Sequence, residues 1–557
     1  METFRDQLIR FQKTNYLRNL QHVRASLSYN PSLIQYENEY LRCLKNYDEI
    51  SSKGELLKKI LGADLVYQGD YHTLRQSQRL ILRILRDIHE KREIILLMEM
   101  FHAVDQKHVD DFLGDKVSEH DFIRKIDYGR KWPFSWQSWS AILYFCKVHR
   151  IPVAGINSQT DEGIRSLRNR DKFAAKIIVK TILKHPGRLA YVIDGDFHIS
   201  PNHLPKEVDH LLKLLDHPVR QLIIYQNAEN LYWKLCKRGH EEADVLKIND
   251  TSYCVMNTMP ANKIQSYLNW IEFSEEAYYP VNREWETEGQ EGDHGITIQE
   301  MITTIAAILG LPMPPGVLET LSIHYANDYH LVDQIQSIKG ISGHIRLIRE
   351  KIKKGEAFLL EYETPETPRY LIYLPSSNIN MAAEEASHFV HAVSRSRSTK
   401  NIGPFDRFYK NTMTECLGFF GSKFINEKRK SHSEHSIRTL LGQIKRAEYR
   451  ERDPLIPQIA KYILQHLYLE RQTEDPSIFY KKFQAVYEKR SFIPIIFSTQ
   501  LGYILGNKLY YAVKKGRFPL SAIRDYFQRP LDDKREAFLA YLHISKELKE
   551  EKAVNQY

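Results

Sequence analysis

The sequence predicts an α/β domain with a mostly parallel sheet flanked by helices, followed by a mainly α-helical domain. Residues 61–226 alternate short β-rich runs with longer helical patterns, which is typical of a parallel sheet with helices on both faces. From residue 296 onward helical periodicity dominates, interrupted by one short hairpin. At 557 residues the chain is too long for one ordinary core, so two or more domains are expected.

The first part opens with helical patterns over residues 1–60, where apolar residues recur at helical spacing. Five apolar runs then predict strands at residues 64–68, 93–98, 151–156, 189–193 and 220–225. Helices are predicted around them at residues 75–91, 104–126, 136–149, 162–184 and 206–214. Residues 251–256 are expected to add an edge strand.

An acidic, glycine-rich segment over residues 283–297 marks the predicted domain boundary. We therefore predict an α/β domain with a helical N-terminal extension over residues 1–285, and a mainly helical domain over residues 286–557. Helices of the second domain are predicted at residues 296–309, 332–354, 381–395, 434–449, 456–469 and 492–515, with a hairpin that pairs residues 357–362 with 369–374.

The composition limits the partners that the chain would bind. Lysine and arginine total 79 against 70 acidic residues, giving a net charge of +9, which permits anionic partners without requiring them. The sequence has no RNP signature, no zinc-finger type of cysteine pair and no long lysine block, so nucleic-acid binding is not expected.

The chain is expected to be cytoplasmic and to lack a membrane span. Its five cysteines are scattered and odd in number, which suits a reducing compartment. The N-terminal residues show no signal-peptide core and no lipobox. The longest apolar stretch, residues 491–513, is interrupted by polar residues, which favours buried helical structure over a membrane span.

Two similar segments follow predicted strands: residues 69–72, Gly-Asp-Tyr-His, and residues 195–198, Gly-Asp-Phe-His. A third strand between them ends at Glu99. The carboxyl ends of parallel strands meet at one edge of the sheet, where ligands bind in such folds. We therefore expect His72, Glu99 and His198 to face one cavity at this edge.

Imidazole and carboxylate are common ligands of a divalent metal, so His72, Glu99 and His198 are the candidate metal ligands. Asp70 or Glu99 would alternatively serve as a general base. Asp70 and Asp196 each precede a histidine by two residues and are candidates to orient the imidazoles. The alternative is strand-end turn chemistry, with the aspartates capping helices; two matched motifs together with Glu99 favour a functional cleft.

Two further features would serve such a cleft. Arg170 lies near the predicted N-terminus of a long helix, where an anionic ligand is favoured; the alternative is an ordinary cap with an exposed arginine. The loop before the predicted helix at residue 136 contains Trp132, Phe134 and Trp136. These rings would form a wall for a flat apolar ligand, or a hydrophobic staple that holds the helix.

The second domain offers one pattern of possible ligands. Glu384, His388 and His391 share one face of a predicted helix, and Glu385 with His388 forms a Glu-x-x-His pair as in di-iron bundles. The sequence of this domain offers no second pair for a facing helix and no His-Glu-x-x-His motif. We therefore interpret the segment as a polar helix face.

Taken together, six elements in order resemble the ChaN-like family: Gly-Asp-Tyr-His72, Leu-Met-Glu99-Met, Lys-Trp132-Pro-Phe, residues 151–157, Arg170-Asp171-x-Phe-Ala and Gly-Asp-Phe-His198. The resemblance covers about residues 55–230. This family belongs to the haem-binding uptake and Tiki superfamily, together with TraB-like and erythromycin-esterase-like proteins. Its members are described as haem-binding iron-uptake proteins in the ChaN branch and as metal-dependent proteases or esterases elsewhere.

The resemblance implies a cleft lined by His72, Glu99, Arg170 and His198. It also shows two departures from the family. Asp70 stands where the family usually has glutamate, one methylene longer, and no lipobox is visible although ChaN proteins are typically secreted lipoproteins.

The leading hypothesis is that the cleft binds haem or a divalent metal ion. For haem, Trp132 would belong to the aromatic wall, Arg170 would pair with a propionate, and the iron ligand would be Tyr71, His72 or His198. Spacing favours a histidine, whereas the ChaN branch implies a tyrosine.

One alternative is a metal-dependent hydrolase of a small-molecule or peptide substrate, with Asp70, Glu99 and Arg170 as catalytic residues. Another is a scaffold with a vestigial cleft, whose helical half binds a protein partner. A homodimer is compatible with either function.

Overall fold

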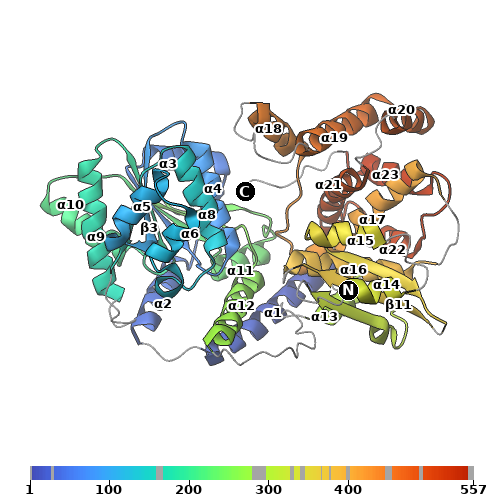
Figure 1. Ribbon diagram of the computed structural model, residues 1–557, viewed down its shortest axis with the longest axis horizontal. Coiled ribbons are helices and arrows are strands. Elements are labelled where there is room, and N and C mark those ends of the chain that lie inside the picture. Colours follow the sequence, from blue (N-terminus) through green and yellow to red (C-terminus); the bar gives the residue numbers. More distant parts are fainter. Residues whose placement is uncertain are drawn as a thin grey trace. The chain divides into compact units, whose positions relative to one another are not determined.

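The computed structural model describes residues 3–26, 31–158, 167–278, 297–325, 331–338, 345–365, 367–375, 378–396, 402–445, 455–488 and 494–549. The chain forms two compact units (Figure 1), each described here by itself. The α/β unit comprises residues 16–282 and 556–557, and the helical unit comprises residues 1–15 and 283–555. The predicted boundary between residues 285 and 286 lies outside the described residues.

The α/β unit is built on an eight-stranded sheet in the order β1-β7-β8-β6-β2-β5-β3-β4. The run from β8 to β4 is parallel, while β7 and β1 add antiparallel pairs at one side. This confirms the mostly parallel sheet. The strands are β1 (Glu49–Ser51), β2 (Leu65–Asp70), β3 (Ile94–His102), β4 (Val153–Asn157), β5 (Leu189–Gly195), β6 (Gln221–Gln226), β7 (Val245–Asn249) and β8 (Ser252–Val255).

The strand predicted at residues 251–256 is not an edge strand. β8 lies between β6 and β7, and β1 pairs on the far side of β7. β7 and β8 form a tight hairpin. β7 was not predicted, because its five residues do not show a clear apolar run or alternation. The buried pattern of β8 follows from its interior place in the sheet.

Helices follow most strands of the α/β unit, as the alternation predicts. They are α1 (Phe4–Ser26, from residue 16 onward), α2 (Pro31–Cys43), α3 (Lys53–Gly62), α4 (Arg75–Ile88), α5 (Gln106–Leu113), α6 (Glu119–Lys125), α7 (Tyr128–Lys131), α8 (Trp136–Val148), α9 (Leu167–Lys184), α10 (Leu204–Leu214), α11 (Glu229–Arg238) and α12 (Pro260–Tyr278). The single helix predicted at residues 104–126 is wrong. α5 ends at Leu113 with Gly114 as its C-cap, and Ser118 caps α6 by accepting a hydrogen bond from the backbone N–H of Asp121.

Alternation along the central strands assigns each residue to one face of the sheet. Leu96 and Met98 of β3, and Tyr191 and Ile193 of β5, belong to one apolar core with residues of α4, α5, α6 and α8. The residues between them point to the opposite face, where α9 packs against β4 and β5. Glu99 therefore lies on the α9 face of the sheet.

The helical unit combines a small sheet with a bundle of helices. Its elements are α13 (Ile298–Leu309), β9 (Leu321–Tyr325), α14 (Leu331–Ser337), α15 (Ile345–Lys353), β10 (Phe358–Glu363), β11 (Pro368–Leu374), α16 (Ile379–Ser394), α17 (Pro404–Ile425), α18 (Glu434–Lys445), α19 (Leu455–Gln472), α20 (Pro476–Glu488), α21 (Pro494–Lys514), α22 (Leu520–Gln528) and α23 (Glu536–Glu547). β10 and β11 form the predicted hairpin, and β9 adds an unpredicted parallel strand beside β11.

The centre of this unit is α17, which the sequence patterns did not predict. α17 is buried on nearly all sides, so it lacks the one-sided apolar stripe by which surface helices are recognised. Gly502 and Gly506 of α21 let the two backbones approach closely, since an added Cβ would lie 2.6 Å from the carbonyl oxygen of Thr412 and 2.5 Å from that of Cys416. In the part of the chain that the structure describes, no helix is both long and apolar enough to cross a membrane.

Candidate functional site

The carboxyl ends of β2, β3 and β5 bring three of the predicted residues together. Gly195, the last residue of β5, marks the meeting point. A Cβ added there would lie 3.4 Å from Nε2 of His72, 3.5 Å from Oε2 of Glu99 and 3.5 Å from Cδ2 of His198. In the β-ladder Asp70 pairs with Gly195, which sets the first motif beside the second.

His72 is held by a buried carboxylate. Its Nδ1 lies 2.8 Å from Oδ2 of Asp70, and Nε2 of Gln78 donates to Oδ1 of the same aspartate at 2.6 Å. The Nε2 of His72 lies 3.7 Å from Oε2 of Glu99. Although burial favours the neutral ring, the hydrogen bond to Asp70 and the charge of Glu99 raise the pKa of His72.

Glu99 is buried and fully engaged. Its Oε1 accepts a hydrogen bond from Arg170 of α9, and its Oε2 accepts the backbone N–H of Gly195 at 2.9 Å. Burial alone would favour the protonated carboxyl, but Arg170 and the two histidines hold the pKa of Glu99 below its ordinary value. Glu99 is therefore an anion that Arg170 neutralises.

Asp194 belongs to this site, although the sequence patterns did not indicate it. Met98 pairs with Ile193, so the residues that follow, Glu99 and Asp194, leave the ladder side by side on the α9 face. Ligand atoms of Glu99, Asp194 and His198 all lie within 4.8 Å of one another and could hold a metal ion. Burial and the nearby charge of Glu99 raise the pKa of Asp194 well above its ordinary value.

The candidate metal group therefore has Asp194 where His72 was expected. The alternation of β5 could have predicted this, because Leu189, Tyr191 and Ile193 share the opposite face. The expected strand ended at residue 193, one residue too early to include the aspartate.

His198 is oriented by Asp171, not by Asp196. Its Nδ1 lies 2.5 Å from Oδ1 of Asp171 on α9, and Tyr36 donates its hydroxyl to Oδ2 of the same aspartate at 2.8 Å. The Tyr36 ring stacks on the ring of His203 at 3.7 Å. No sequence pattern indicated this series of hydrogen bonds, since Tyr36 and Asp171 lie on separate helices.

Asp196 points instead into a buried ion cluster. Nζ of Lys263 on α12 lies 3.5 Å from its Oδ2 and 3.2 Å from Oε1 of Glu229. Burial raises the pKa of Asp196 to about 6, although Lys263 opposes this shift. The ammonium group of Lys263 also lies 4.7 Å from the centre of the Tyr71 ring. Tyr71 and His72 thus face different surroundings.

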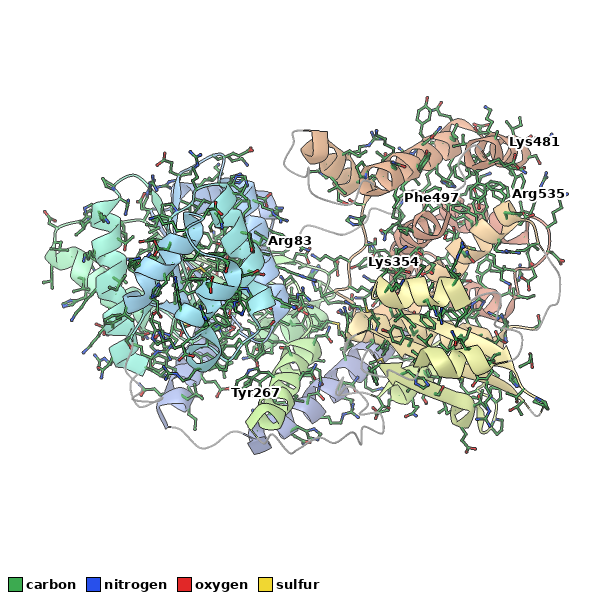
Figure 2. The ribbon with its side chains drawn as sticks, viewed as in Figure 1. Arg83, Tyr267, Lys354, Lys481, Phe497 and Arg535 are labelled. Carbon is green, nitrogen blue, oxygen red and sulfur yellow. The ribbon has the colours of Figure 1, made fainter. Side chains whose placement is uncertain are left out.

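Aromatic rings cover the other side of His72. The rings of Trp132 and Phe134 lie 4.7 Å and 4.8 Å from the imidazole, centre to centre. Phe134 stacks in turn on Trp270 of α12, near Tyr267 of the same helix, which Figure 2 labels. Trp136 is not part of this wall, because its indole N–H donates to Glu119 and its ring packs on other aromatic residues.

A small polar cavity lies on the α9 side of the site. Its volume is about 200 Å³ including open solvent. It is lined by Glu99, Ile156, Asn157, Arg170, Asp171, Ala174, Asp194 and His198. Most of that volume is open solvent, so the cavity has room for an ion or a single water and is too small to enclose a porphyrin.

The segment interpreted as a polar helix face is buried. Glu384, Glu385 and His391 of α16 are each less than a tenth exposed, and the His388 side chain is 12% exposed. The interpretation failed because α17, which packs on α16, was not recognised as a helix.

Comparison with known proteins agrees with the sequence resemblance. Residues 56–169 match the model of a family described as "Haem-binding uptake, Tiki superfamily, ChaN", which confirms the resemblance over this segment. The chain is also similar to a solved structure described as cofacial heme binding to ChaN of Campylobacter jejuni, with 11% identity and a TM-score of 0.26, covering 32% of this chain and 87% of that one. No curated protein matches the chain.

Proposed function

We propose that the α/β unit binds haem, with His72 as the ligand of the iron. The observation that carries the proposal is the position of His72. Buried Asp70 fixes its Nδ1, the rings of Trp132 and Phe134 pack against it, and 24% of its side chain is exposed. The family match over residues 56–169 supports haem as the ligand.

A haem site needs an apolar ring surface, an iron ligand and a cation that pairs with the propionates. The residues around His72 supply the first two. Phe134 and Trp270 supply partly exposed ring surface, with buried Trp132 packed behind Phe134. An imidazole whose other nitrogen is held by a carboxylate is a good iron ligand. The polar cavity is too small for the macrocycle, so haem would lie outside it, against the aromatic rings, and its iron would have to reach Nε2 of His72, the nitrogen that faces Glu99. Arg170 is occupied by Glu99 and would reach a propionate only by leaving that carboxylate.

Titration of haem into the apo-protein tests this proposal. We expect a saturable Soret shift that His72→Ala abolishes and that Tyr71→Phe leaves unchanged, because the Tyr71 ring contacts Lys263 instead. A shift lost in Tyr71→Phe and kept in His72→Ala would transfer the iron ligand to the tyrosine. If both variants and Arg170→Ala titrate like the wild type, haem does not bind at this site. If the wild type gives no shift, the haem proposal is wrong.

A second candidate function is supported by a separate observation, the cluster of Glu99, Asp194 and His198 within 4.8 Å. A divalent ion bound there would supply an acidified water for hydrolysis of an ester or peptide bond. Arg170 would keep Glu99 ionised, and Asp171 would hold His198 with its Nε2 free. This candidate is the metal-dependent hydrolase.

Metal analysis and an esterase and peptidase panel test the second candidate. Asp194→Asn should release the metal and abolish hydrolysis, while Asp209→Asn, on the outer side of α10 beside Lys213, should change neither. Asp171→Asn should lower metal affinity by about 10–100-fold through loss of the orienting hydrogen bond. A protein that binds neither metal nor haem would instead be a scaffold with a vestigial cleft.

A further inference from the structure

We propose that the helical unit contains a separate binding site for a divalent transition-metal ion, formed by Glu384 and His388 of α16 and Glu415 of α17. One ligand atom from each residue lies within 4.8 Å of the other two. The site does not depend on the haem or hydrolase proposals, because all its residues belong to the other compact unit.

His388 has the arrangement of a metal-ligating histidine. Its Nδ1 lies 3.2 Å from Oε2 of Glu385, which fixes the tautomer and leaves Nε2 as the ligand atom. Nε2 is buried and has no hydrogen-bond partner among the described residues. A buried imidazole nitrogen normally has one, so Nε2 of His388 is available to an ion or a water.

The facing helix is shaped to receive this imidazole. α17 has Gly418 opposite the ring, and an added Cβ at that position would overlap Nε2 of His388. Gly418 stands three residues after Glu415, so both lie on the face of α17 that meets α16. The glycine thus makes room for the ring beside the carboxylate.

Glu384 provides a second unpartnered atom. Arg429 donates to its Oε2 at 2.6 Å, and the Tyr503 hydroxyl lies near the same carboxylate, while its Oε1 is buried with no hydrogen bond of ordinary geometry in the described part of the chain. The side chain is only 7% exposed. Leaving a buried carboxylate oxygen unpaired is costly, and a bound cation removes that cost.

The surrounding carboxylates provide further oxygen ligands. Glu384, Glu385 and Glu415 meet around one imidazole, and Arg429 pairs with only the first of them. One imidazole with two carboxylates suits Zn²⁺, Mn²⁺ or Fe²⁺ better than Ca²⁺ or Mg²⁺.

The test uses the full-length protein, stripped with a chelator, loaded with Zn²⁺ and desalted, and measures zinc per chain by elemental analysis. Asp194→Asn serves as the background, because the α/β unit has its own candidate metal group. In this background we expect one zinc per chain, lost on adding His388→Gln and retained with His391→Gln, a buried histidine of the same helix outside the group.

Two further variants separate metal binding from misfolding. Gly418→Ala keeps every ligand but displaces the imidazole, and Glu415→Gln is nearly isosteric, so both should lose the zinc while keeping the helical circular-dichroism signal. Co²⁺ loading should give visible d–d bands that follow the same pattern. The proposal is overturned if the Asp194→Asn background holds no zinc, or if His388→Gln, Glu415→Gln and Gly418→Ala hold as much zinc as that background.

Discussion

Substitution by alanine should have different effects on the stability of the α/β unit at Gly69 and at Gly195, the first residues of the two Gly-Asp-aromatic-His motifs. Gly69 and Gly195 lie on neighbouring strands, where Gly69 pairs with Asp194 and Asp70 with Gly195. A methyl group on Gly195 would lie 3.4–3.5 Å from His72, Glu99 and His198, which is ordinary van der Waals contact. A methyl group on Gly69 would overlap Oδ1 of Asp196 and lie 2.9 Å from Cδ1 of Ile199.

These distances set the expected magnitudes. Gly195→Ala introduces no overlap and reduces the freedom of the unfolded chain, so stability should be unchanged or rise by up to about 1 kcal/mol. The methyl group would occupy the point between the two imidazoles and the carboxylate, so ligand affinity should fall by about tenfold or more. Gly69→Ala overpacks the core beneath the site and should destabilise the α/β unit by about 1–3 kcal/mol.

Urea unfolding followed by tryptophan fluorescence measures the stability of this unit. Five of the six tryptophans belong to the α/β unit, namely Trp132, Trp136, Trp139, Trp233 and Trp270, so the signal reports mainly on this unit; Trp285 belongs to the other. Haem and zinc titrations of the same proteins measure affinity. The reasoning would be refuted if Gly195→Ala bound ligand like the wild type, or if it lost as much stability as Gly69→Ala.

Three further outcomes are expected. Iron ligation needs neutral His72, whose pKa is raised by Asp70 although burial opposes this, so haem affinity should increase with pH around and above pH 6.5, and Asp70→Asn should move that midpoint to lower pH. Folding raises the pKa of Asp196 from 3.8 to about 6, so the folded state holds this proton more tightly. Stability should therefore fall as the pH rises from 4 to 6, by at most about 3 kcal/mol. Equal pH profiles for Asp196→Asn and the wild type in urea unfolding would contradict this. Gly502→Ala should destabilise the helical unit by about 1–3 kcal/mol in unfolding followed by circular dichroism, because its methyl group meets an α17 carbonyl at 2.6 Å, whereas Gly442→Ala, with nothing within 4 Å, should not.

Local sequence pattern was sufficient for the central parallel strands and for the placement of the two motifs. Apolar runs separated by helical patterns predicted the parallel strands, and a parallel sheet brings strand ends to one edge whatever the details of packing. The sequence alone therefore predicted that His72 and His198 lie near Glu99, as the structure confirms. β7 and α17 were missed because neither shows the one-sided periodicity on which such predictions depend.

The direction of each side chain was decided by tertiary structure. Asp70 and Asp196 occupy equivalent places in similar motifs, yet one orients a histidine and the other pairs with Lys263, because the helices packed above them differ. Asp171 reaches His198 from a helix begun some thirty residues earlier in the chain.

The same division applies to the helical unit. The sequence alone established that Glu384 and His388 share a helix face. Whether that face meets water or Glu415 depended on which helix packs against it. Periodicity records which residues of an element lie together, but a face acquires its partner, its burial and its charge environment only when another element packs on it.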